Sequence, residues 1–140
     1  GAGLTGALAS LVYWFPKMTG RMLDTKLSWV SFWFVQIGFN VAFIGMFFVG
    51  LQGQPRRVEA YAAIFNKGNL VTSIGAATIM TGMLVLLAAV IGSWRSGVKA
   101  PMNPWHAKSL EWTVPYPVPL ENFATLPVVT EDVYGYGRKN

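Results

Sequence analysis

Two long stretches without charge decide the fold of this chain: LSWVSFWFVQIGFNVAFIGMFFVGL at residues 27–51 and NLVTSIGAATIMTGMLVLLAAVIGSW at residues 69–94. Over 25 and 26 residues, respectively, neither contains Asp, Glu, Lys or Arg. At about 1.5 Å of rise per residue, each is long enough to cross a hydrocarbon core of roughly 30 Å with some tilt. Both stretches are therefore predicted to be transmembrane helices.

A third apolar stretch, residues 1–15, is also uncharged but is only 15 residues long. We interpret it as the second half of a truncated spanning helix. Pro16 and the turn at residues 17–20 are expected to end this helix, because proline and glycine stop helices. Residues 1–98 are thus the predicted transmembrane part of an all-α membrane protein, with helices at about 1–15, 27–51 and 69–94.

The composition of the 140-residue chain agrees with a membrane protein. It is 53% hydrophobic and 12% charged, whereas soluble domains contain about a quarter charged residues. This composition excludes a disordered tail, and the absence of Cys excludes a disulfide scaffold, thiolate metal sites and thiol nucleophiles. The eleven Lys and Arg residues give a net charge of +5 but form no run, so nucleic acid is not an expected partner.

The basic residues of the connections predict the orientation in the membrane. Three of them lie in the middle loop, residues 52–68, and the other eight flank the first and third helices: Lys17, Arg21, Lys26, Arg95, Lys99, Lys108, Arg138 and Lys139. The positive-inside rule therefore places the first loop and the C-terminal tail in the cytoplasm or matrix. The middle loop is expected to face outward.

Small residues spaced four apart are expected to let neighbouring helices approach closely. Three such sets occur in the two long stretches: Gly38 with Ala42, Ser73 with Ala77 and Thr81, and Ala88 with Gly92.

One face of the second helix combines two amides with two aromatic rings: Gln36, Asn40, Phe43 and Phe47. Their intervals of four, three and four residues place them on the same side of a helix. Amides inside a membrane need partners, so this face is expected to look into a helix bundle. For Gln36 and Asn40 we expect hydrogen bonds to neighbouring helices and no direct chemical part.

The middle loop begins with the most specific feature, Gly50-Leu51-Gln52-Gly53-Gln54-Pro55-Arg56-Arg57. Two adjacent guanidinium groups repel one another unless an anion lies between or beneath them, and Arg suits bidentate contacts with carboxylate or phosphate. An anion is therefore expected at Arg56 and Arg57. On spacing alone, lipid headgroups are the favoured anion.

The wider context of these motifs resembles subunit I of haem-copper terminal oxidases. The run from Gly38-Phe39-Asn40 through Phe43 to Arg57 is similar to the eleventh helix of that family and its following loop. Tyr13-Trp14-Phe15-Pro16-Lys17-Met18-Thr19-Gly20-Arg21 resembles the end of the tenth helix. Three further motifs resemble the C-terminal tail: Asn103-Pro104-Trp105, Leu110-Glu111-Trp112 and Glu121-Asn122-Phe123. The resemblance reaches about Val129, in the expected order and spacing.

The resemblance implies that the chain is part of a larger twelve-helix bundle that transfers electrons through haem to oxygen and pumps protons. It also implies that Arg56 and Arg57 contact propionates of the low-spin haem and of the haem at the oxygen-reducing site, and that Phe43 packs near the haems. The remaining part of subunit I, other oxidase subunits and membrane lipids are the implied partners. Cytochrome c and quinol both stay open as electron donors, and a bacterial or archaeal cell membrane or the mitochondrial inner membrane as the location.

The chain departs from the family in ways that bear on activity. Many members have Pro-x-His where this chain has Gly45-Met46-Phe47, so a polar contact by that His is in doubt. The family's haem and copper ligands belong to helices upstream, and the one histidine here, His106, is expected to make an ordinary polar contact on the inner surface. The chain alone is therefore not expected to reduce oxygen. Either subunit I is split or the chain is incomplete, and a break inside a helix favours the second.

The tail, residues 99–140, has a different composition, because six of the eight prolines lie there. Proline at this density favours extended, polyproline-like backbone. The interleaved Trp105, Trp112 and Phe123 are expected to be buried against protein on the inner side, and residues 130–140 to be disordered or in contact with a partner.

A small multi-span accessory or assembly subunit without haem contact is the alternative function, because it would show the same hydropathy.

Overall fold

A computed structural model of the chain describes residues 1–123, which form three α-helices and two short 3₁₀ helices. The elements are α1 (Ala2–Thr19), α2 (Thr25–Leu51), η1 (Ala63–Phe65), α3 (Asn66–Ser96) and η2 (Leu110–Trp112). They group into two compact units, which we describe separately: one holds Asp24–Ile91 together with Gly1, and the other holds Ala2–Leu23 and the chain from Gly92 onward.

Among the described residues, two helical segments, Thr25–Leu51 and Ala63–Ser96, are long and apolar enough to cross a membrane. They contain the two charge-free stretches, residues 27–51 and 69–94, and the second segment begins earlier than its stretch. An N-cap starts α2, since the Asp24 carboxylate accepts a hydrogen bond from the Leu27 N–H at 2.9 Å. Gly53 follows its end with φ of +97°, a conformation that favours glycine.

The first helix is longer than the expected residues 1–15, because α1 continues through Pro16 to Thr19 before it ends in the predicted turn at residues 17–20. Pro16 lacks the N–H that would donate to the preceding turn, but the turn that follows it is completed and the helix continues. Gly20 provides the true end: its φ is +68°, and its N–H donates to the Pro16 carbonyl oxygen at 2.9 Å.

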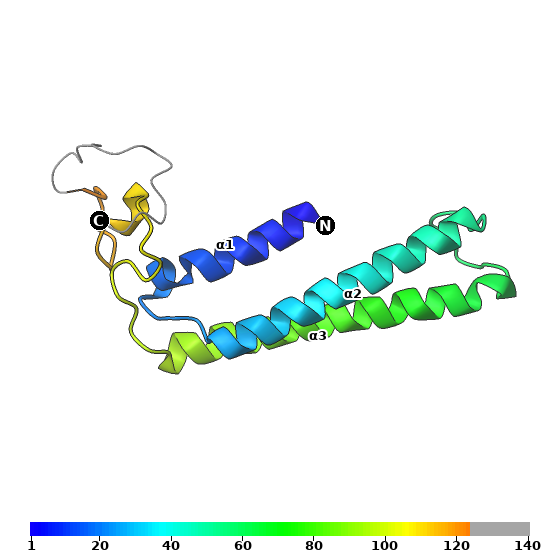
Figure 1. Cartoon of the computed structure of the whole chain (residues 1–140), viewed down its shortest axis with the longest axis horizontal. Coiled ribbons are helices and arrows are strands. Elements are labelled where there is room, and N and C mark those ends of the chain that lie inside the picture. The colour runs from blue at the N-terminus through cyan, green and yellow to red at the C-terminus, as the bar shows by residue number, and fades with distance from the viewer. Residues whose placement is uncertain (124–140) are drawn as a thin grey trace. The chain divides into compact units, whose positions relative to one another are not determined.

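In the first unit, α2 and α3 pack side by side as an antiparallel hairpin (Figure 1). The buried positions recur at intervals of three and four along both helices, as in a coiled coil. On α2 they include Ser31, Val35, Gly38, Ala42 and Val49, and on α3 they include Thr72, Gly75, Gly82, Leu86 and Ala89. We call this contact surface the hairpin seam.

Glycines bring the two backbones of the hairpin seam into direct contact. A Cβ atom built on Gly38 would lie 2.8 Å from the Gly75 carbonyl oxygen, whereas ordinary contact begins at 3.4 Å. One seam hydrogen bond joins the helices, from the Ser31 hydroxyl to the Gly82 carbonyl oxygen at 2.8 Å. The expected close approach at Gly38 and Ala42 is therefore confirmed.

The other two sets of small residues take no part in the hairpin seam. Ser73, Ala77 and Thr81 are exposed, as are Ala88 and Gly92. Instead, α3 presents Gly75 and Gly82, which are seven residues apart, to α2.

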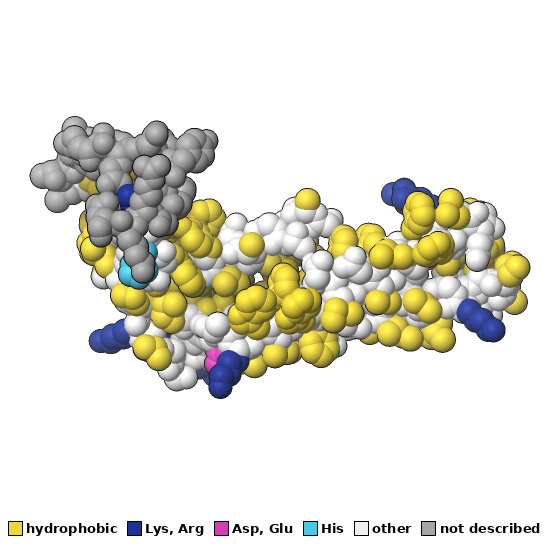
Figure 2. Space-filling view, viewed as in Figure 1, with side chains coloured by type: hydrophobic (Ala, Val, Ile, Leu, Met, Phe, Trp, Pro, Cys, Tyr) yellow, Lys and Arg dark blue, Asp and Glu magenta, His cyan; other side chains and the backbone are white. Residues whose placement is uncertain are grey.

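Large hydrophobic side chains cover much of the outside of this hairpin, and Lys and Arg lie toward its ends (Figure 2). Phe47, for example, is 63% exposed and Met80 is 67% exposed. A surface of this kind is unfavourable in water and suits lipid or further protein helices.

In the second unit, the segment after α3 packs on α1 through aromatic residues. Trp112 is 1% exposed, and its indole N–H donates to the Tyr13 hydroxyl at 2.8 Å. Trp105 stacks on the same ring and donates to the Tyr13 carbonyl oxygen at 2.9 Å, but it stays 40% exposed. Phe123 is half-buried. Burial is thus confirmed for Trp112 and is only partial for Trp105 and Phe123.

Lys17, near the end of α1, also contacts the segment after α3. Its ammonium group donates to the Val114 carbonyl oxygen and lies 5.3 Å from the centroid of the Trp112 ring. Burial lowers the pKa of Lys17, and the Glu111 carboxylate partly opposes that shift. Residues 130–140, which are expected to be disordered or in contact with a partner, lie outside the described range.

Candidate functional site

The loop that contains the two arginines is tied to both long helices. Beyond Gly53, the Gln54 N–H donates back to the Val49 carbonyl oxygen at 3.3 Å. The Gln54 side-chain oxygen accepts a hydrogen bond of 3.0 Å from the Asn69 amide in the first turns of α3. Arg56 follows Gln54 by two residues, so these contacts fix where the arginine pair begins.

Arg56 and Arg57 are both exposed. Arg57 has a left-handed backbone with φ of +57°, which is uncommon outside glycine. Within residues 1–123, neither guanidinium group forms an ion pair or a hydrogen bond with the protein. Each guanidinium group has five N–H donors in a fixed fork, so the pair can bind an external carboxylate or phosphate.

Phe43 lies on α2 outside the hairpin seam. Its ring is 48% exposed and stacks on Phe39, with centroids 4.3 Å apart and planes at 29°. The exposed Phe43 ring, backed by the half-buried Phe39 ring, offers a flat apolar surface to a neighbour.

The structure does not bring Phe43 into contact with the arginine pair. Phe43 precedes the last residue of α2, Leu51, by eight residues, which corresponds to about 12 Å along the helix axis. A single ligand would therefore have to extend along α2 to reach both.

The predicted polar face of α2 is exposed over its length, at Gln36, Asn40, Phe43 and Phe47. The Asn40 amide donates one hydrogen bond to the Gln36 carbonyl oxygen at 2.7 Å, within its own helix. The hydrogen bonds expected from Gln36 and Asn40 to neighbouring helices stay a prediction. That this face looks into a bundle stays a prediction.

The contact between Gln54 and Asn69 is a feature that sequence reasoning missed. Both residues were visible as amides at opposite ends of the loop. Their pairing depends on how closely the helix ends approach, which spacing alone does not specify.

Metal ligation was not expected of this chain. Within the described range, no group of three or more His, Cys, Asp or Glu side chains could hold a metal ion. His106 is exposed in the segment after α3, with φ of +50°, and its backbone N–H donates to the Asn103 carbonyl oxygen at 3.5 Å.

Comparison with known proteins gives matches along nearly the whole chain. The family model described as Cytochrome C and Quinol oxidase polypeptide I matches residues 1–78. Cytochrome c oxidase subunit 1 of Thermostichus vulcanus is 42% identical over 137 residues, which cover 98% of this chain and 25% of that protein. The subunit 1 proteins of Bacillus sp. strain PS3 and of Synechocystis sp. are 40% and 39% identical, over 87% and 96% of this chain. They are covered to 20% and 25% of their own lengths, so the chain spans a quarter or less of these relatives.

Proposed function

Because this chain belongs to the cytochrome c and quinol oxidase polypeptide I family, we propose that it forms the C-terminal part of the catalytic subunit of a respiratory terminal oxidase. That subunit would pass electrons through haem to oxygen and couple this reaction to proton pumping. The observation that carries the proposal is the 42% identity to a cytochrome c oxidase subunit 1 over 98% of the chain. The names of the relatives favour cytochrome c over quinol as the electron donor.

Within this function, Arg56 and Arg57 are proposed to bind haem propionates. Their fit to the group rests on their exposure, on the lack of any ion pair for either among residues 1–123, and on the match between a guanidinium fork and a carboxylate. Haem, when bound, supplies the electron transfer. The arginines would neutralise the carboxylates and hold the cofactor edge at the end of α2, without a part in proton transfer.

Phe43 is proposed to pack against a haem through its exposed ring, and the support for this is its stacked arrangement with Phe39 outside the hairpin seam. The axial ligands of the haems and of the copper would come from other parts of the subunit. This chain would contribute helix packing and propionate contacts.

In the membrane, the C-terminal tail is proposed to lie on the cytoplasmic or matrix side and the arginine loop on the outer side. The support is the distribution of the eleven basic residues. Three lie within residues 52–68, which include the arginine loop, whereas eight lie within residues 17–26 or from residue 95 onward. The remaining part of subunit I, other oxidase subunits and lipids would cover the exposed apolar faces of α2 and α3.

Purification of the assembly that contains this chain tests the proposal. We expect a haem spectrum typical of an oxidase and oxygen uptake with reduced cytochrome c or with quinol. A colourless assembly without oxygen uptake from either donor would contradict the proposal and favour a multi-span accessory subunit.

A further inference from the structure

Two cations face each other where the chain after α1 meets the chain after α3. Arg21 and Lys99 are partners in an isolated antiparallel bridge. Two backbone hydrogen bonds flank the pair: Met22 N–H to the Val98 oxygen at 2.8 Å, and Ala100 N–H to the Gly20 oxygen at 2.9 Å. Arg21 and Lys99 are thus a non-hydrogen-bonded pair, the type in which side chains lie closest, with Cα atoms about 4.5 Å apart.

Like charges in directly opposite positions destabilise such a bridge unless an anion neutralises them. Among residues 1–123, no carboxylate forms an ion pair with either side chain. Arg21 uses one of its five N–H groups on the Gly97 carbonyl oxygen, at 2.6 Å. Lys99 is exposed and makes no side-chain hydrogen bond within the described range. The pair therefore keeps donors and positive charge for an anion from outside.

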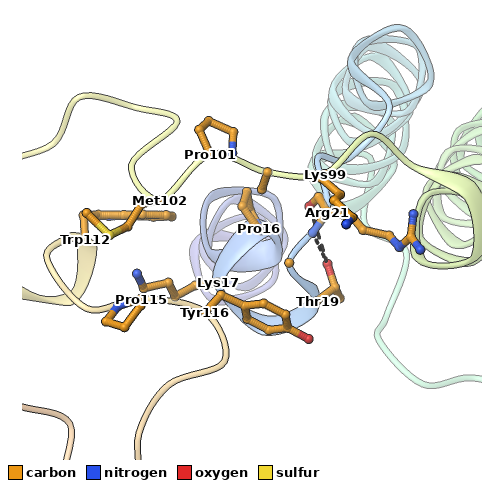
Figure 3. Close-up of a pocket in the computed structure, with 12 residues that line it drawn as sticks. Pro16, Lys17, Thr19, Arg21, Lys99, Pro101, Met102, Trp112, Pro115 and Tyr116 are labelled. Carbon is orange, nitrogen blue, oxygen red and sulfur yellow. Dashed lines mark hydrogen bonds between the residues drawn. The ribbon is translucent and has the colours of Figure 1, made fainter.

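Both residues line a cavity of about 570 Å³, which lies within the second unit. Figure 3 shows Arg21 and Lys99 next to each other on one side of the cavity, and Trp112 and Pro115 on the other. Lys17 adds a third cation to the lining, although its ammonium group is partly engaged by Val114. The volume falls in the range of ligand sites, and the lining combines cations with proline, methionine and aromatic side chains.

We propose that this cavity binds a phosphate-bearing anion, and that the anion is the headgroup of an anionic phospholipid. Guanidinium and ammonium groups are the side chains that bind phosphate. The cavity lies directly after the uncharged stretch 1–15 and directly after the charge-free stretch that ends at Trp94. Lipid phosphates lie at this level of a membrane, and Trp and Tyr side chains such as Trp112 and Tyr116 are typical of it.

Lys99 is the residue to change. Its exposed side chain makes no hydrogen bond or ion pair within residues 1–123. The hydrogen bonds of the bridge are formed by the backbone of neighbouring residues, so a substitution at Lys99 leaves them in place. The purified assembly that contains this chain is stripped of lipid and titrated with short-chain phosphatidylglycerol, and bound lipid is counted by native mass spectrometry. Inorganic pyrophosphate and short-chain phosphatidylcholine form two further arms. Lys26→Gln is the matched control, since Lys26 is an exposed lysine five residues after Arg21 in the sequence and does not line the cavity.

We expect phosphatidylglycerol to bind in preference to phosphatidylcholine, and Lys99→Gln to weaken that binding about fivefold, which corresponds to about 1 kcal/mol for one basic residue. Lys99→Arg is expected to retain binding and Lys26→Gln to leave it unchanged. Pyrophosphate binding that depends on Lys99, with no Lys99-dependent lipid binding, would keep the phosphate site but overturn the lipid assignment. If Lys99→Gln changes neither ligand more than Lys26→Gln does, the proposal is wrong. Haem content and oxygen uptake are expected to be the same in both variants, so this test is separate from that of the proposed function.

Discussion

Replacing Gly75 with Ala tests the direct backbone contact in the hairpin seam. A Cβ atom at this position would lie 2.8 Å from the Ala42 Cα and 2.9 Å from the Ala42 Cβ, whereas ordinary contact begins at 3.4 Å. Because the clashing atoms are backbone or attached directly to it, no side-chain rotation can relieve the overlap. The helices α2 and α3 would have to separate by about half an ångström, a gap that already loses a quarter of the dispersion attraction at each contact.

Overpacking of this kind costs about 1–3 kcal/mol, so Gly75→Ala is expected to raise the unfolded fraction between about fivefold and more than a hundredfold at a given denaturant concentration. An SDS titration of the purified assembly, followed by circular dichroism, measures the shift in the denaturation midpoint. The control is Gly92→Ala, on the same helix, where an added Cβ meets nothing within 4 Å. If Gly75→Ala shifts the midpoint no more than Gly92→Ala does, the two backbones do not touch as described.

Two further substitutions test the contacts that hold the segment after α3 and the hairpin. Trp112→Ala is expected to destabilise the packing on α1 by about 3–5 kcal/mol, since this side chain is 1% exposed and bonded to Tyr13, whereas Trp105→Ala, at a site 40% exposed, should cost clearly less. Limited proteolysis between residues 103 and 123 checks this, and equal cleavage rates in the two variants would refute it. Ser31→Ala removes the hydrogen bond to Gly82 and is expected to cost about 0.6–1.7 kcal/mol, measured by the same SDS titration. An unchanged midpoint would show that this hydroxyl contributes nothing to the hairpin seam.

The two long helices could be predicted because length without charge is a local property of the sequence. Contacts between residues far apart in the sequence could not be predicted from such local patterns. A search for small residues four apart finds Gly38 and Ala42 but misses Gly75 and Gly82, because the partner helix meets them at a coiled-coil spacing of seven. Of the two stop signals expected after the first apolar stretch, Pro16 lies inside α1, and Gly20, with its positive φ, ends the helix.

For the two candidate sites, too, local features could be predicted from the sequence and contacts between distant residues could not. Arg56 and Arg57 could be selected from their residue type and position after an apolar helix, and the structure leaves both exposed. The pairing of Arg21 with Lys99 joins residues 78 positions apart in the chain, through backbone bonds of their neighbours. No sequence motif contains both residues, so only the folded chain shows them together.

A redox titration of the haems in the purified assembly tests the central claim most directly. Arg56→Gln and Arg57→Gln each remove a positive charge beside a proposed propionate, and reduction adds negative charge to a haem, so its midpoint potential should fall. About 59 mV corresponds to a tenfold change in a one-electron equilibrium, and we expect a decrease on the order of tens of millivolts with axial ligation unchanged. Lys67→Gln, an exposed cation at the start of α3, is the control and should leave both midpoints in place. Midpoints that stay the same in all three variants would show that the arginine pair does not contact haem.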